Sequence, residues 1–184
     1  MGTRALERLK ILLSSPNLRH LTMDNCGFSA ETIPTFNESL QVTEGEGPGF
    51  ARLHSLICNR NMIGLGGAQA LSEYLRDCVD MRYFSYRGCR PLMEGTAALV
   101  GALHAISQSE NHNLENIDLV DCNLKSGEED DHPIHVFGKV IANCPLLTRL
   151  NIEDCDDLNE TGCSIIGQAL VESKAKMVEL NMGT

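Results

Sequence analysis

The stretch Leu53–Leu75, LHSLICNRNMIGLGGAQALSEYL, decides the fold of this chain. Its first apolar residues stand at spacings of three and two, which predicts a short strand with inward-pointing residues: Leu53, Leu56 and Cys58. Asn61 then closes the strand. The next apolar positions follow in steps of four, which places one stripe along one side of a helix: Gly67, Leu71 and Leu75. The stretch therefore predicts a strand, a tight loop and a helix.

The same unit recurs 28 residues later, counted from Leu53 to Met81. Its equivalent positions are Met81, Phe84, Tyr86, Cys89, Gly95, Leu99 and Leu103. A fixed period of this size with the pattern L-x-x-L-x-L-x-x-N/C is that of a leucine-rich repeat. The fold class expected is α/β, a right-handed horseshoe-shaped solenoid with a parallel sheet on its concave face and helices on its convex face.

The pattern extends over the whole chain, so we expect a single leucine-rich-repeat domain of residues 1–184 with about five full repeats. The strands are expected near residues 20–23, 55–58, 83–86, 116–119 and 149–152. A helix over Ala5–Leu13, with Leu6, Leu9, Leu12 and Leu13 on one side, and a strand from Met177 are partial repeats at the two ends. Neither end carries the polar cap that a solenoid needs. We therefore expect further repeats or another chain to cover the ends.

Composition restricts the classes of partner. The 184 residues include 15 Lys and Arg against 25 Asp and Glu, which gives a formal charge of -10. An acidic chain is unsuited to nucleic acid or to membrane surfaces, and it favours a protein partner with a basic face. No apolar run approaches the roughly 20 residues of a membrane span, and no signal peptide opens the chain. These features indicate the cytosol or the nucleus.

The cysteines follow the repeat rather than a metal-binding pattern. Four of the eight occupy the position that Asn61 fills in its own repeat: Cys26, Cys89, Cys122 and Cys155. There is no C-x-x-C pair, which argues against zinc, and buried thiols in a reducing compartment explain the pattern. We expect these four sulfurs to lie buried along the stack, with no disulfide.

No motif for catalysis or for a cofactor is found. The glycines of Gly64–Gly67 lack the Lys and Ser/Thr of a phosphate-binding loop, and no nucleophile stands with its base. His132 and His135 lie beside carboxylates, but their spacing of three is poor support for a metal site. We therefore expect no cofactor and no active site of the chain's own.

Two segments interrupt the regular period. Gln41–Gly49, QVTEGEGPG, lengthens one return loop and indicates mobile surface. The acidic run Glu128–Asp131 precedes Pro133. Asp131 could cap the following helix, where carboxylates suit the helix dipole, or the run could form an acidic lip that faces a basic partner.

Residues between the inward leucines are expected on the concave face. Basic residues, Arg60 and Arg87, stand in the middle rows, and acidic residues dominate the last two rows, which include Asp121 and Asp154. Curved repeat surfaces of this kind bind partners. The alternative is a face that is merely solvated, with Arg60 paired to an acid such as Asp24 in the row before it.

Several motifs, taken in order, resemble the Ran GTPase-activating proteins. Ile57–Asn61, ICNRN, resembles the strand ending I-C-G-R-N-R of that family and follows a return loop with Pro48, as in the family. Arg90-Pro91 with Glu94-Gly95 resembles the family's R-P-E-G. Leu114–Cys122, LENIDLVDC, and Leu147–Cys155 resemble its next two strands, and Leu170–Ser173 its return to a further strand. The resemblance covers about Leu18 to Met182.

The resemblance implies a role in nuclear transport, in a cytoplasmic or nuclear-envelope-associated protein. Family members stimulate GTP hydrolysis by ordering the GTPase's own glutamine, and they supply no arginine finger. The contacts with a Ran-type GTPase would then fall on Asn59, Arg60, Asn61, Arg87, Asp121, Cys122 and Asp154. Two positions depart from the family: Met62 replaces an arginine, and Cys122 replaces the asparagine that helps to orient that glutamine. Cys122→Asn restores the family residue and is expected to raise hydrolysis.

A second resemblance leads to a different function. Asn143-Cys144-Pro145, followed by L-x-x-L-x-I-x-x-C up to Cys155 and by Leu158, resembles the cysteine-containing repeats of F-box substrate receptors. No F-box precedes the repeats. The alternative is therefore a non-catalytic leucine-rich-repeat adaptor or an F-box-type substrate-receptor module.

Overall fold

The computed structural model describes residues 2–40, 53–125, 132–155 and 158–183. Six short strands form one parallel sheet whose order follows the chain: β1 (His20–Thr22), β2 (Ser55–Ile57), β3 (Tyr83–Ser85), β4 (Asn116–Asp118), β5 (Arg149–Asn151) and β6 (Glu179–Asn181). The pairing keeps one register throughout, because the first residues of successive strands are partners. All five strands expected from the period are confirmed to within one residue, and the expected sixth strand is β6.

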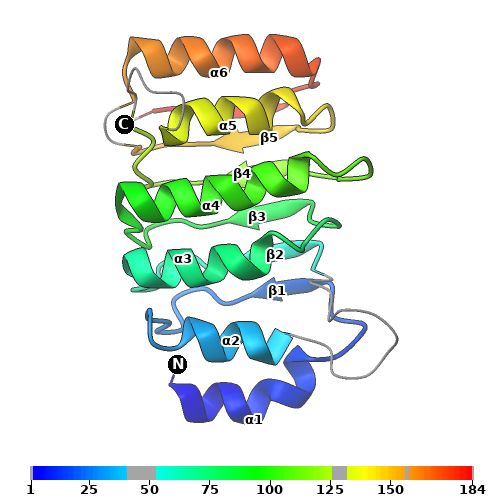
Figure 1. The fold of residues 1–184 in the computed structure, drawn as a ribbon, viewed down its shortest axis with the longest axis vertical. Coiled ribbons are helices and arrows are strands. Elements are labelled where there is room, and N and C mark those ends of the chain that lie inside the picture. Colours follow the sequence, from blue (N-terminus) through cyan, green and yellow to red (C-terminus); the bar gives the residue numbers. More distant parts are fainter. Residues whose placement is uncertain (1, 41–52, 126–131, 156–157, 184) are drawn as a thin grey trace.

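Six helices lie in a layer over one face of this sheet (Figure 1). They are α1 (Thr3–Leu13), α2 (Ile33–Leu40), α3 (Gly64–Leu75), α4 (Leu92–Ser107), α5 (Pro133–Ala142) and α6 (Glu160–Ser173). Each helix from α2 onward follows its own strand, and each packs against the next helix along the chain. The sheet is open at both ends rather than closed into a barrel. The structure is thus an α/β stack of strand–loop–helix units, and no described helix covers the other face of the sheet.

The core lies between the sheet and the helix layer. The central residue of each inner strand is fully or almost fully buried: Leu56, Phe84, Ile117 and Leu150. Leu71, Leu99 and Leu103 from the helices are also fully buried, as the steps of four predict. At the ends of the stack the burial falls off. Leu12 is 66% exposed, so the prediction that it shares the buried side of its helix is wrong.

Helix packing explains why a glycine recurs at one position of the unit. A Cβ atom added to Gly67 would lie 2.3 Å from Cγ2 of Ile63 and 3.2 Å from the Cα of Ala30, in the preceding unit. One unit later, a Cβ atom on Gly95 would lie 3.1 Å from that of Ala68. The glycines therefore allow neighbouring helices to approach closely.

The position shared by Asn61 and the cysteines forms a ladder of hydrogen bonds from one unit to the one before it. Each side chain donates to a carbonyl just past the preceding strand: Asn61 Nδ2 to Met23 (2.7 Å), Cys89 Sγ to Cys58 (3.0 Å), Cys122 Sγ to Tyr86 (3.5 Å) and Cys155 Sγ to Leu119 (3.1 Å). None of the eight cysteines, all of which lie in the described ranges, forms a disulfide. The predicted burial is confirmed for Cys89, Cys122 and Cys155, whereas Cys26 is only half-buried.

Two predictions fall on segments that the structure does not describe. The loop Gln41–Gly49 and the acidic run Glu128–Asp131 lie outside the described residues, and Asp131 as a helix cap lies there with them. Helix α5 begins with His132 as its N-cap residue, which makes no capping hydrogen bond with its side chain, and Pro133 follows at the first helical position. In the described part of the chain, no helix is both long and apolar enough to span a membrane.

Candidate functional site

Each unit places one residue in a left-handed backbone conformation, five positions after the start of its strand. These residues, which we call the left-handed row, are Asn25, Arg60, Gly88, Asp121 and Asp154, with φ values of 49°, 56°, 59°, 58° and 52°. The backbone N–H of each donates to a carbonyl of the next unit over 2.7–3.3 Å. This hydrogen bonding extends the register of the sheet past the strand ends. It therefore fixes five successive side-chain positions along one rim of the stack.

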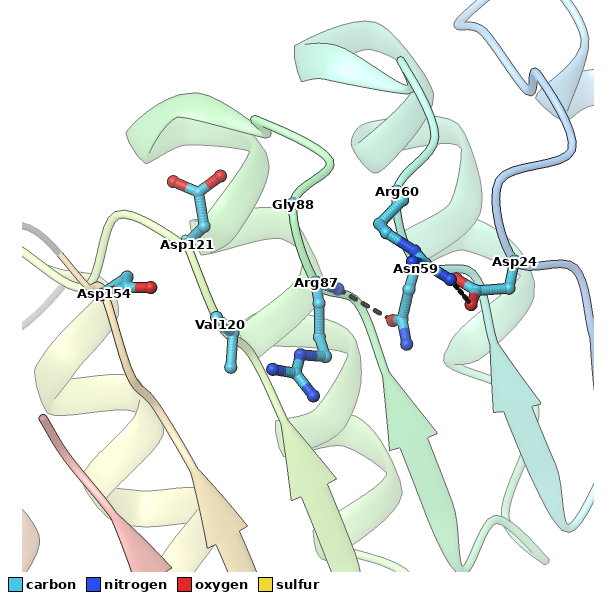
Figure 2. A pocket seen from close by; sticks show the side chains of 8 residues that line it. All are labelled: Asp24, Asn59, Arg60, Arg87, Gly88, Val120, Asp121 and Asp154. Atoms are coloured by element: carbon cyan, nitrogen blue, oxygen red, sulfur yellow. Dashed lines mark hydrogen bonds and ion pairs between the residues drawn. The ribbon is translucent and has the colours of Figure 1, made fainter. Parts of the chain in front are cut away.

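A hollow of about 740 Å³ opens along this rim (Figure 2). Each lining residue either belongs to the left-handed row or immediately precedes a member of it: Asp24, Asn59, Arg60, Arg87, Gly88, Val120, Asp121 and Asp154. Five of the seven residues predicted to contact a partner are among them, namely Asn59, Arg60, Arg87, Asp121 and Asp154. The structure thus brings these five together from four successive units.

Arg60 is paired within the hollow. Its Nη2 donates to Oδ2 of Asp24 over 2.5 Å, and the Arg60 side chain is still 69% exposed. The hydrogen bond to Asp24, and after it the charge of that carboxylate, raise the pKa of the Arg60 guanidinium. The pairing of Arg60 with Asp24, which the sequence offered as an alternative to partner contact, is therefore present. The pair still leaves most of the Arg60 side chain open to solvent or to a partner.

Asn59 and Arg87 belong to a network that continues across the open face. Asn59 Oδ1 accepts from the backbone N–H of Arg87 at 3.0 Å and lies 2.8 Å from the Ser85 hydroxyl. The same hydroxyl lies 3.0 Å from Oδ2 of Asp118, which is 3.7 Å from the Arg87 guanidinium. Burial raises the pKa of the Asp118 carboxyl, and the charge of Arg87 and the hydrogen bond with Ser85 oppose that shift. The network holds Arg87 between the two ends of the hollow.

The acidic end of the hollow is different. Asp121 and Asp154 are exposed, and neither carboxylate forms an ion pair with any described residue. Figure 2 shows these two side chains at one end and the Arg60–Asp24 pair at the other, with Arg87 between them. The two guanidinium groups are compensated, at Asp24 and at Asp118, whereas the two acids of the left-handed row are not. The charge left for a partner at this rim is therefore negative.

The remaining two predicted residues, Asn61 and Cys122, point into the molecule instead. Each is 1% exposed. Asn61 Nδ2 donates to three carbonyls, and its Oδ1 accepts from the backbone N–H groups of Cys26 and Phe28. Both side chains belong to the ladder that joins the units, and in this structure they offer almost no exposed surface to a partner. An asparagine at position 122 would likewise face the interior rather than a GTPase.

The groups lining the hollow are suited to recognition. They are carboxylates, guanidinium groups, an amide and one aliphatic side chain, and no nucleophile with a neighbouring base is among them. Among the described residues, no group of three or more His, Cys, Asp or Glu is placed to hold a metal ion. Such a surface can form ion pairs and hydrogen bonds with another molecule.

A second, smaller hollow on the same rim was not predicted from the sequence. It measures about 240 Å³, shares Asp121 and Asp154 with the larger one, and is also lined by Leu92 and Asn123. Leu92 is exposed and has a φ of 60°. Aligning the two regular units in sequence could have drawn attention to Leu92, because it falls where the preceding unit has Gly64.

Comparisons with known proteins bear on the fold alone. No protein-family model matches the chain, and no curated protein matches it. Among solved structures, it is similar to leiomodin-1 actin-binding site 2, with a TM-score of 0.54 and 14% sequence identity over 93% of this chain and 88% of that one. A similarity at this level of identity supports the α/β class and the order of the elements. It carries no information about the partner.

Proposed function

We propose that this chain is a leucine-rich-repeat horseshoe that binds a protein partner through the hollow on its rim. One observation carries the proposal: Asn59, Arg60, Arg87, Asp121 and Asp154, selected from the sequence as partner contacts, line a single hollow. A hydrogen-bonded backbone holds them in place, so little freedom is lost when a partner binds. The partner is a protein whose contact surface carries basic groups.

The proposed horseshoe shape is supported by the widths of the two layers. Neighbouring strands stand about 4.8 Å apart, whereas a helix with its side chains is about 10 Å wide. A stack with a sheet on one face and helices on the other is therefore shorter along its sheet, and it curves with the sheet inside. The parallel in-order sheet and the helix layer of this chain meet that condition. The open face of the sheet would then be the concave face.

For the identity of the partner, we propose a Ran-type GTPase. The resemblance of Ile57–Asn61 and of the following strands to the Ran GTPase-activating proteins supports this choice. In this scheme the rim docks against the GTPase and orders the GTPase's own glutamine, so the chain itself contributes only positioning. Because Cys122 is buried, the amide available at this edge is that of Asn123, which is half-exposed and lines the smaller hollow.

An adaptor without any effect on hydrolysis is the second candidate. It is favoured by the position of Cys122, since the residue that replaces the family's orienting asparagine does not reach the surface. An adaptor would use the same hollow and would bind its partner without changing the rate of GTP hydrolysis. An F-box-type receptor module belongs to this class.

One experiment separates these proposals. Purified chain is added to Ran loaded with GTP, and binding and single-turnover hydrolysis are measured. Actin is tested in parallel, because the structurally similar leiomodin-1 fragment is an actin-binding site. Arg60→Ala is compared with Arg82→Ala, which removes another exposed arginine that pairs with an acid, Glu115, outside the hollow.

We expect Arg60→Ala to weaken Ran binding at least about tenfold, since central interface arginines have large effects, and Arg82→Ala to change it by less than about twofold. Binding without faster hydrolysis would select the adaptor. Binding of actin alone would reject the Ran proposal. Equal losses of Ran affinity in both variants would show that the larger hollow is not the binding site.

A further inference from the structure

Helix α4 begins with a leucine in a left-handed backbone conformation. Leu92 has a φ of 60° and is 60% exposed. Gly64 occupies the same place at the start of α3, three residues after Asn61 as Leu92 is three residues after Cys89, and its φ is 62°. This backbone is unfavourable for leucine and carries no such penalty for glycine. The preceding unit thus reaches the same conformation with a glycine, so the leucine side chain is not required for it.

The smaller hollow beside Leu92 is of a size for a side chain. Its volume of about 240 Å³ is below the roughly 300–1,000 Å³ of sites for small molecules. The loops after β3, β4 and β5 form it, and Leu92, Asp121, Asn123 and Asp154 all line it. Its lining thus combines an exposed apolar group with two carboxylates and an amide.

The charges around this hollow favour a cation. Asp121 and Asp154 form no ion pair with the described residues, and Arg90 is the one basic residue in the lining. Two carboxylates against one guanidinium leave a net negative charge at the hollow. Arg60 and Arg87 do not neutralise it, since Asp24 and Asp118 already hold them.

We propose that Leu92 is an apolar anchor of the interface and that this hollow receives a lysine or arginine side chain of the partner. The cation pairs with Asp121 and Asp154, and an apolar residue next to it in the partner covers Leu92. The recognised segment is thus a basic residue adjacent to an aliphatic one. This inference rests on the proposed function, because it assumes that a protein partner docks on the same rim.

The test uses the full chain labelled with ¹⁵N and three synthetic 12-residue peptides. Their central residues are Arg-Leu-Arg, Arg-Ser-Arg and Glu-Leu-Glu, in otherwise identical Gly/Ser sequences. The Arg-Leu-Arg peptide should shift the amide signals of Leu92, Asp121, Asn123 and Asp154 and should bind at least fivefold tighter than Arg-Ser-Arg. The Glu-Leu-Glu peptide should shift none of them. Equal binding of the two arginine peptides, or no shift with any peptide, would overturn the proposal.

Two variants test the role of Leu92 itself. Leu92→Asn removes the apolar group and keeps a residue that tolerates left-handed backbone, so its thermal midpoint should stay within about 2 °C of the wild type. The Leu92→Asn variant should bind the Arg-Leu-Arg peptide at least fivefold more weakly than the wild type does. The control is Leu146→Asn, at a leucine that is 49% exposed, in the loop before β5 and outside both hollows. A similar effect of both variants would reject Leu92 as an anchor.

The inference and the proposed function can fail separately. If Arg60→Ala weakens Ran binding while Leu92→Asn leaves Ran binding unchanged, the larger hollow is retained as a binding site and the role of Leu92 as an anchor is rejected. If the Arg-Leu-Arg peptide binds in a manner that depends on Leu92 and Ran does not bind at all, the recognised segment stands and the Ran proposal is rejected.

Discussion

The guanidinium of Arg60 lies 2.5 Å from the carboxylate of Asp24, which belongs to the preceding unit of the stack. The pair bridges two loops that are 36 residues apart in the sequence, at the place where both leave the sheet. Because the Arg60 side chain is 69% exposed, water screens the pair strongly. Its main effect is to hold the guanidinium at the edge of the hollow.

The first prediction is that Arg60→Ala leaves the fold almost as stable as the wild type. Exposed ion pairs contribute little to stability, and alanine makes the same backbone hydrogen bond to the carbonyl of Arg87. We expect thermal midpoints within about 2 °C of each other in a calorimetric comparison. A much lower midpoint would show that Arg60 is structural, and its effect on binding would then be indirect.

The second prediction concerns Asn61. Asn61→Ala leaves the buried N–H of Phe28, the half-buried N–H of Cys26 and three carbonyls without this partner, so we expect a loss on the order of 2–5 kcal/mol in the free energy of unfolding, measured in urea. Cys89→Ala, at the same position of the next unit, is the matched control and should cost clearly less, since a thiol is a weak donor. Equal costs would mean that the asparagine has no special role in the ladder.

The third prediction tests the helix layer. Leu71 is fully buried in α3, so Leu71→Ala should lower the free energy of unfolding by about 2–5 kcal/mol through lost burial and the cavity that remains. Leu12→Ala removes the same atoms from a leucine that is 66% exposed and should cost less than about 1 kcal/mol. Chemical denaturation of the two variants side by side provides the comparison. Similar losses would contradict the assigned packing.

The fourth prediction concerns pH. Burial raises the pKa of Asp118 above the value of about 3.9 expected in the unfolded chain. Between these two pKa values the folded protein holds a proton that the unfolded chain has lost, so the contribution of Asp118 to stability is full below about pH 3.9. It is lost as the pH rises through the folded pKa.

Asp118→Asn removes this titration. The stability of the variant minus that of the wild type should therefore decrease as the pH is lowered from 7 to 4, because the wild type alone gains from protonating Asp118. Unfolding in urea at several pH values measures the difference. A difference that does not change with pH would contradict the assigned shift.

The sequence predicted the strands well because the repeat determines them. The position held by Leu56, Phe84, Ile117 and Leu150 recurs in each of these units, and all four residues are buried. The exceptions lie at the ends of the stack. Cys26 is only half-buried and its Sγ donates to the carbonyl of Asp24 in its own loop, and no strand before β1 lies in the described part of the chain. A periodic pattern carries no information about such end effects.

The candidate site was only partly predictable, for a local reason. Arg60 and Asn61 are neighbours in the sequence, yet one is exposed and the other is buried. The left-handed backbone at Arg60 turns the chain between them, and the resemblance that placed both residues at the contact surface carries no information about that turn. The same geometry separates Asp121 from Cys122. Leu92 was missed because, as the exposed first residue of α4, it lies outside the buried apolar stripe of its helix.

The most direct test of binding through the hollow is to map the surface of the ¹⁵N-labelled chain that Ran loaded with GTP covers. We expect the amide signals of Arg60, Arg87, Gly88, Asp121 and Asp154 to shift or broaden together on addition of the GTPase, and Arg60→Ala to weaken the response at least about tenfold. Shifts confined to the helix layer or to the ends of the stack, with the left-handed row unaffected, would contradict binding through the hollow.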